Sequence, residues 1–183
     1  KSDELQLIST QLAKYLSPQL HKRIFDAKQS VQVKSERKKL TIFFSDLVGF
    51  TSMSERLESE EVTALLNFYL DEMSKIALEF GGTIDKFVGD AIMVFFGDPE
   101  TQGAATDAIK CLNMAIKMQN RMATLSKEWS KKYNLHSPLQ VRIGLSSGFC
   151  TVGNFGSSDR LDYTAIGSPV NLAARVQSAA SPS

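Results

Sequence analysis

The chain has 183 residues, of which 43% are hydrophobic and 22% charged, and its formal net charge is +1. This length and composition allow one α/β domain with a sizeable core. Because the net charge is close to zero, no global field attracts nucleic acid or an anionic membrane, and an anionic substrate must be held by a local site.

The first part of the chain, residues 1–35, is predicted to be a helical segment ahead of the main domain. Within residues 3–16, apolar side chains recur at spacings of three and four, which predicts an amphipathic helix with one narrow apolar stripe. Residues 28–39 are polar and basic, and we expect them to form an exposed linker into the first strand.

The main domain, residues 36–183, alternates between strand and helix patterns. Its first predicted elements are a buried strand at 40–44, a helix from 59 to about 80, and a hairpin of two strands at 83–87 and 91–96. The later ones are a long helix at 104–132, strands at 139–147, 149–155 and 161–166, and a last helix at 170–179. The order is β-α-β-β-α-β with additions, which predicts an α/β (α+β) domain of the ferredoxin-like, split βαβ type.

The two cysteines, Cys111 and Cys150, lie far apart and show no metal-ligand spacing. We expect two buried, reduced thiols, which fits the cytoplasm. No apolar run approaches the length needed to cross a bilayer, so we expect no membrane contact by this domain, whether or not its parent chain is attached to a membrane.

Two aspartates stand where predicted strands end. Asp46 follows the strand at 40–44, and Asp90 lies in the turn of the hairpin. In a β-α-β-β unit the first strand lies beside the hairpin, so both carboxylates can converge where hard oxygen ligands suit Mg²⁺ or Mn²⁺. Two metal ions at such a pair can clamp an in-line phosphoryl displacement. Either aspartate alone also fits an ordinary turn or helix cap.

The segment that follows Asp46 offers a cradle for phosphate groups. Gly49 permits close approach to the backbone, and the N–H groups of Phe50 and Thr51 point towards a helix start.

Four runs of sequence resemble, in the right order, the catalytic domain of class III adenylate and guanylate cyclases. They are FFSDLVGFTSMSE (43–55), GGTIDKFVGDAIMVFFG (81–97), VRIGLSSGFCTVGNFGS (141–157) and DYTAIGSPVNLAARV (162–176). The resemblance covers roughly residues 36–180 and is far more specific than a lone glycine motif. Residues 5–27 resemble the segment that precedes many bacterial cyclase domains and often relays a signal from an upstream sensor.

The resemblance implies a role for each matching residue. Asp46, Asp90 and the backbone carbonyl of Leu47 match the ligands of two metal ions, Mg²⁺ or Mn²⁺. Asn171 and Arg175 match the pair that orients the ribose and stabilises the transition state. Their spacing of four places both on one helix face, although an exposed surface pair has the same spacing.

Lys86 and Thr164 match the two positions that read the base, and Thr164 indicates the Thr subgroup of bacterial adenylate cyclases. Lysine donates but cannot accept hydrogen bonds, so Lys86 favours the N1 acceptor of adenine over the N1–H of guanine. The Thr164 hydroxyl can accept from the exocyclic amine of adenine. Without the resemblance, a solvated strand lysine and an ordinary strand threonine explain both residues equally well.

The sequence also departs from the family pattern. Phe149 stands where some members carry a basic residue. The family usually continues into further strands after the helix of Asn171, and one of them supplies a lysine for the triphosphate. We therefore expect the C-terminal strands of the domain to lie beyond these 183 residues.

The sequence thus predicts an adenylate cyclase, a lyase of signal transduction that converts ATP to cyclic AMP and pyrophosphate, active as a homodimer with sites at the interface. The nearest alternative is a guanylate cyclase, against which Lys86 argues. A noncatalytic dimerisation or signalling module is a further alternative, opposed by the retained site residues. A polymerase palm shares the strand order, but the net charge of +1 argues against nucleic acid as a partner.

Overall fold

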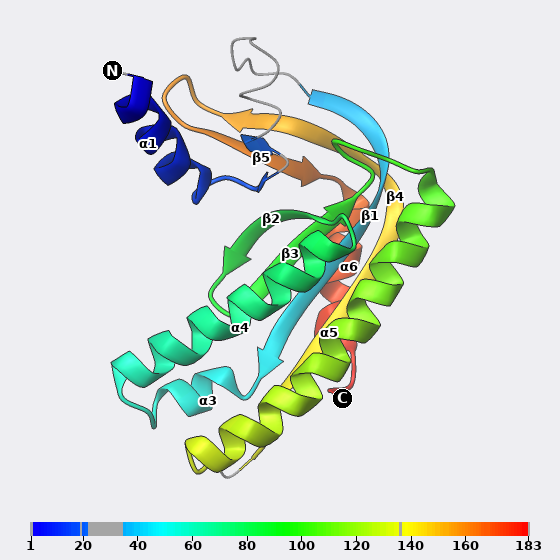
Figure 1. The fold of residues 1–183 in the computed structure, drawn as a ribbon. Coiled ribbons are helices and arrows are strands. Elements are labelled where there is room, and N and C mark those ends of the chain that lie inside the picture. Colours follow the sequence, from blue (N-terminus) through cyan, green and yellow to red (C-terminus); the bar gives the residue numbers. More distant parts are fainter. Residues whose placement is uncertain (1, 19, 22–34, 136, 183) are drawn as a thin grey trace.

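The computed structural model describes residues 2–18, 20–21, 35–135 and 137–182 (Figure 1). Its elements are α1 (Ser2–Ala13), β1 (Ser35–Val48), α3 (Phe50–Ser54), α4 (Ser59–Glu79), β2 (Thr83–Val88), β3 (Ala91–Phe96), α5 (Ala104–Lys132), β4 (Gln140–Gly156), β5 (Leu161–Ile166) and α6 (Ser168–Ala179). Within these described ranges, no helix has both the length and the apolar character that crossing a bilayer requires.

The strands form one sheet in the order β2-β3-β1-β4-β5, and every neighbouring pair is antiparallel. The first four strands in the chain lie as they do in a ferredoxin-like domain, and β5 extends the sheet beyond β4. The predicted fold class is therefore confirmed. The chain passes from β1 to β2 through α4 and from β3 to β4 through α5.

Helices cover both faces of the sheet, with α4 and α5 on one side and α6 on the other (Figure 1). Alternate residues of one strand therefore enter different cores. On β1, Phe43 packs with the side chains of α4 and α5, whereas Ile42 packs with Ala173 of α6. Because both faces are buried, β1 and β3 carry continuous apolar runs rather than an alternating pattern.

Two sequence expectations about strands were wrong. The linker expected at 28–39 lies outside the described residues up to 34, and from Ser35 onwards it is strand β1, hydrogen-bonded to β4. Backbone pairing with β4, rather than burial of side chains, holds this part of β1 in place. Its side chains are polar and mostly exposed, so the sequence shows no apolar pattern there.

The break expected at Gly148 is also absent, since β4 runs unbroken from Gln140 to Gly156. A Cβ atom on Gly148 would lie 2.6 Å from Cγ of Pro169. The glycine therefore permits close packing of α6 on the strand rather than ending the strand.

The sheet is curled so strongly that its outermost strands, β2 and β5, contact one another. Figure 1 shows β5 lying across from β2 above the hairpin. This curvature places residues of β2 and β5 in a single site, although three strands separate them along the sheet.

Candidate active site

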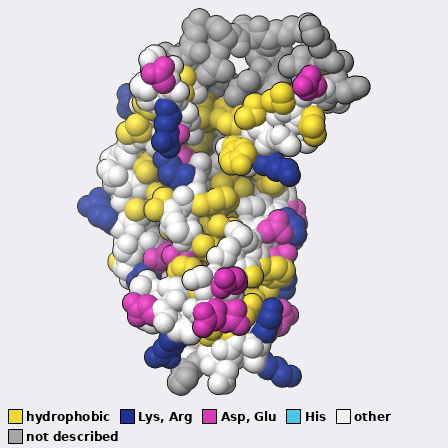
Figure 2. All heavy atoms as spheres, turned by 90° about the vertical axis from the view of Figure 1, so that its left-hand side faces the viewer, with side chains coloured by type: hydrophobic (Ala, Val, Ile, Leu, Met, Phe, Trp, Pro, Cys, Tyr) yellow, Lys and Arg dark blue, Asp and Glu magenta, His cyan; other side chains and the backbone are white. Residues whose placement is uncertain are grey.

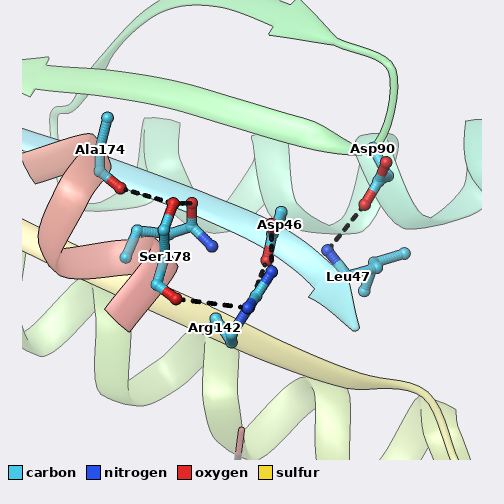
Figure 3. A network of polar contacts seen from close by, with 7 residues as sticks. Asp46, Leu47, Asp90, Arg142, Ala174 and Ser178 are labelled. Carbon is cyan, nitrogen blue, oxygen red and sulfur yellow. Dashed lines mark hydrogen bonds and ion pairs between the residues drawn. The ribbon is translucent and has the colours of Figure 1, made fainter. Parts of the chain in front are cut away.

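Asp46 lies on β1, two residues before the strand ends, and forms a two-pronged ion pair with Arg142 of β4 (Figure 3). Nε of Arg142 donates to one carboxylate oxygen at 3.1 Å and Nη2 donates to the other at 2.9 Å. The two residues are direct cross-strand partners in the β1–β4 register, which explains the geometry. The guanidinium also donates to the carbonyl of Ser178 at the end of α6, at 3.4 Å.

Asp90 reaches the same end of β1 from the β2–β3 turn. Its carboxylate accepts a hydrogen bond from the backbone N–H of Leu47 at 2.8 Å (Figure 3). The preceding residue, Gly89, has a φ of 61°, a conformation that favours glycine in this tight turn. The structure therefore brings Asp46 and Asp90 together at the end of β1.

The electrostatics of neighbouring groups reflect these two carboxylates. Hydrogen bonding and the charge of Asp46 raise the pKa of Arg142, and the charge of Asp90 acts in the same direction. Burial raises the pKa of the Tyr69 phenol, and both aspartates add to that rise. Tyr69 is fully buried on α4, and its phenol is close enough to Asp46 and Asp90 to respond to their charges.

The donor set at this end of β1 fits a hard divalent cation. The Asp46 carboxylate already pairs with one positive group, the guanidinium of Arg142. The site is only partly exposed, with the Asp46 side chain 25% accessible. Among the described residues, no three or more His, Cys, Asp or Glu side chains are grouped so that they could hold a metal ion by themselves, and a cation bound here would need waters or phosphate oxygens as further ligands.

Arg142 was not singled out from the sequence. An arginine in the expected strand at 139–147 has an ordinary explanation as an outward-facing residue. Only the register between β1 and β4, which pairs Arg142 with Asp46, identifies it. Strand register between segments about a hundred residues apart is not readable from a single sequence.

The expected phosphate cradle lies directly after β1. Gly49 has a φ of 83° and precedes α3. The first hydrogen bond of the turn runs from the N–H of Met53 to the carbonyl of Gly49, at 3.0 Å. The N–H groups of Phe50 and Thr51 come before that bond and so lack a partner within the helix.

Lys86 and Thr164 come from opposite edges of the sheet, on β2 and β5. Lys86 is 46% exposed at its side chain, whereas Thr164 is buried. The carboxylate of Asp85 lies between them: it accepts from the Thr164 hydroxyl at 2.6 Å, and its other oxygen is 3.4 Å from Nζ of Lys86. The structure thus brings both expected base-reading residues to one point, through a residue that the sequence did not reveal.

Asn171 and Arg175 project from α6 and are exposed. No hydrogen bond or ion pair joins either of them to Asp46 or Asp90, although all four lie in the described ranges. Among the described residues, these two pairs therefore make no direct polar contact. Phe149, the departure from the family pattern, is exposed and lies 5.0 Å from the guanidinium carbon of Arg37.

Comparisons with known proteins agree with this architecture. Residues 32–183 match the family model described as "Adenylate and Guanylate cyclase catalytic domain". An adenylate cyclase of Anabaena cylindrica is 39% identical over 142 residues, which cover 76% of this chain and 27% of that protein. The chain thus spans about a quarter or less of the first curated relatives that it matches.

Solved structures point the same way. The adenylyl cyclase CyaB from P. aeruginosa is 56% identical with a TM-score of 0.79, over 82% of this chain and 76% of that one. The guanylyl cyclase Cya2 is 38% identical with a TM-score of 0.74, over 81% and 73%. Since the family model spans most of the chain and the curled, helix-covered sheet superimposes on both of these cyclases, the chain belongs to the adenylate and guanylate cyclase catalytic domain family.

Proposed function

We propose that the chain is the catalytic domain of an adenylate cyclase, which forms cyclic AMP and pyrophosphate from ATP. The observation that carries the proposal is the convergence of Asp46 and Asp90 on the end of β1 in a chain of this family. In the reaction the ribose 3′-oxygen attacks the α-phosphorus in line, and the P–O bond to pyrophosphate breaks. Free, buried cysteines are in keeping with a cytoplasmic site for this reaction.

The carboxylates of Asp46 and Asp90, with the carbonyl of Leu47, would hold two Mg²⁺ or Mn²⁺ ions. Such ions, when bound, neutralise the triphosphate and lower the pKa of the attacking hydroxyl. The chain itself contributes orientation. The N–H groups of Phe50 and Thr51, which have no partner within α3, follow Gly49 directly after β1 and can bind phosphate oxygens.

Base choice rests with Lys86 and Thr164. The ammonium of Lys86 donates to the N1 acceptor of adenine, and the Thr164 hydroxyl accepts from its exocyclic amine. The chemistry of these two groups favours ATP over GTP.

The site is completed by a second copy of the chain. Asn171 and Arg175 are exposed, and within the described ranges they make no hydrogen bond or ion pair to the aspartates of their own subunit, so we propose that they act on the substrate bound by the partner's aspartates. Large apolar side chains next to the site are also exposed, namely Phe87, Val88, Ile166, Leu172 and Val176. Figure 2 shows hydrophobic side chains gathered in the middle of one face, the face on which α1 and β2 lie in Figure 1. A homodimer interface would cover such groups.

Residues 1–35 have a separate role in this proposal. An amphipathic helix such as α1, with Ile8 and Leu12 exposed, is suited to pairing with a partner helix. We assign it to the relay of a signal from an upstream sensor domain to the catalytic domain.

The test is product identification with the full-length protein, ATP or GTP, and Mn²⁺. We expect cyclic AMP as the main product. Asp46→Asn and Asp90→Asn should each remove nearly all activity, by a factor of about a hundred or more. Asp71→Asn, a change at an exposed ion pair on α4, is the matched control and should retain activity.

Two results would contradict the proposal. Cyclic GMP as the dominant product would make the chain a guanylate cyclase. Activity within a few-fold of wild type in either aspartate variant, at saturating metal and with an unchanged circular dichroism spectrum, would rule out the two-metal site.

A further inference from the structure

A buried carboxylate joins the two edges of the sheet at the base-reading residues. Asp85 lies on β2 with its side chain only 1% exposed. Its Oδ2 accepts two hydrogen bonds from β5, one from the Thr164 hydroxyl at 2.6 Å and one from the backbone N–H of Ala165 at 3.2 Å. Burying a carboxylate in this way is expensive, so its presence calls for an explanation beyond a surface polar residue.

A bulge in β2 makes this arrangement available. The β2–β3 register shifts between Ile84 and Lys86, so Asp85 is the extra residue. In a regular strand Asp85 and Lys86 would point to opposite faces of the sheet. Here Oδ1 of Asp85 lies 3.4 Å from Nζ of Lys86, and the hydrogen bonds of the carboxylate are those of Oδ2 with β5.

The direction of the Thr164 hydrogen bond carries the inference. A threonine hydroxyl has one proton to donate and two lone pairs that accept, so alone it can meet either the amine of adenine or the carbonyl oxygen of guanine. In this structure the proton goes to Asp85. Since a carboxylate is an acceptor only, the hydroxyl can offer the base nothing but lone pairs.

We propose that Asp85 is a positioning residue for base choice, which fixes the Thr164 hydroxyl as a hydrogen-bond acceptor and so selects adenine over guanine. The proposal rests on the adenylate cyclase function proposed above. The guanine carbonyl at the same place would need a donor, and Thr164 could supply one only by giving up its charge-assisted bond to Asp85. Asp85 does not touch the substrate and acts through Thr164.

The test compares the kcat/KM for ATP with that for GTP in the full-length protein carrying Asp85→Ala. Without Asp85 the Thr164 hydroxyl rotates freely and can donate to guanine, so we expect the ATP/GTP ratio to fall roughly tenfold. The change should appear mainly in the KM values, because the reacting atoms are untouched. If Asp85→Ala does not fold, Asp85→Asn replaces it, with a smaller shift in the same direction.

A double-mutant cycle with Thr164→Val separates this route from others. Valine keeps the shape of threonine without its hydroxyl, so in that background removal of Asp85 should change the ATP/GTP ratio by less than about twofold. A full shift in the Thr164→Val background, or no shift in the wild-type background, overturns the proposal.

Asp107→Ala is the matched control. Asp107 is also buried and also accepts from a threonine hydroxyl and a backbone N–H, those of Thr101 and Gln102. The Asp107→Ala substitution should lower the melting temperature without changing the ATP/GTP ratio of kcat/KM. A chain that makes no cyclic AMP at all would refute the proposed function, whereas an active, ATP-selective chain whose ratio ignores Asp85 would refute this inference alone.

Discussion

Arg142 places a positive charge beside the carboxylate of Asp46 at the end of β1. The pair is bidentate, but both side chains are partly exposed, at 30% and 25%. Exposed ion pairs contribute only about 0–1 kcal/mol to stability. The ion pair therefore adds little to the stability of the fold, which fits an aspartate whose role is binding rather than folding.

The proposed base preference can be tested by replacing Lys86 and Thr164 with residues of different hydrogen-bonding character. Lys86→Glu with Thr164→Cys should lower the use of ATP and raise the relative use of GTP, because a carboxylate accepts from the N1–H of guanine. Overall activity should also fall, since the new carboxylate would stand beside the buried Asp85. The measurement is the ATP/GTP ratio of kcat/KM, with Lys75→Glu on α4 as a surface control. An unmoved ratio would mean that these residues do not read the base.

Asp85 should leave a signature in the pH dependence of stability. Burial raises the pKa of its carboxyl above the ordinary 3.8, against the opposing effects of Thr164, Lys86 and the Ala165 amide. The folded chain therefore holds this proton to higher pH than the unfolded chain. Its contribution to stability is present below 3.8 and is lost as pH rises through the folded pKa.

Asp85→Asn cannot titrate, so wild type should lose stability relative to this variant as pH rises above 3.8 and through the raised pKa of the folded chain. Urea unfolding of both proteins at several pH values measures the difference. A difference that is constant, or that grows in favour of wild type, would contradict the assigned shift.

At the scale of elements, α6 packs closely against β4 because glycines of β4 leave room for the helix. A Cβ atom on Gly144 would lie 2.2 Å from the carbonyl oxygen of Ala173 and from the backbone nitrogen of Gln177. This contact is with backbone, so the helix itself would have to move. The same helix end accepts a hydrogen bond from Arg142, which links its position to the aspartate site.

Gly144→Ala should therefore destabilise the fold by at least about 2 kcal/mol, at the severe end of overpacking substitutions. Gly148→Ala, which would meet only the ring of Pro169 at 2.6 Å, should cost less because a side chain can shift more easily than a helix backbone. Denaturant unfolding of the two variants gives the comparison. Equal losses, or a larger loss at Gly148, would show that α6 does not pack as described.

The sequence predicted the elements whose signal is local and missed what depends on pairing. The helices α4, α5 and α6 and the β2–β3 hairpin follow from periodicity and turn residues, and they were confirmed. The first residues of β1 and the continuity of β4 through Gly148 depend on long-range partners. A pattern of local hydrophobicity cannot report such partners.

The same distinction applies to the site. Asp46 and Asp90 could be placed together from the strand order, because each stands near the end of an apolar strand. The contact of Arg142 with Asp46 depends on the register between β1 and β4. The position of Asp85 depends on a β-bulge that the residue pattern does not predict. The roles of Lys86 and Thr164 came from family resemblance, and they stay predictions until the base preference is measured.

At the scale of the whole molecule, the proposal that Asp46 of one subunit and Arg175 of the other share a site predicts that two defective subunits can repair one another. Asp46→Ala removes the metal half of a site, and Arg175→Ala removes the other half. In a mixed dimer one site carries both defects and the other carries neither. Random mixing makes half of the dimers mixed, so roughly a quarter of wild-type activity should return.

The measurement uses the complete protein, mixed in equal amounts and left long enough for subunits to exchange. A mixture of Asp46→Ala with Asp90→Ala is the matched control, because both changes fall in the same half and no good site can form. If the first mixture gives no more activity than the control, each subunit must carry its own complete site.

Because β2 and β5 contact one another, the curvature of the sheet sets the distance between Lys86 and Thr164, the proposed base-reading residues. Lys86 and Thr164 are joined by two paths: a long one across three intervening strands and a short one through the single carboxylate of Asp85. Flattening the sheet would lengthen the gap that Asp85 spans, and tightening it would close the space for the base. If Lys86 and Thr164 read the base as proposed, affinity for the substrate and discrimination between bases both depend on the curvature of the sheet.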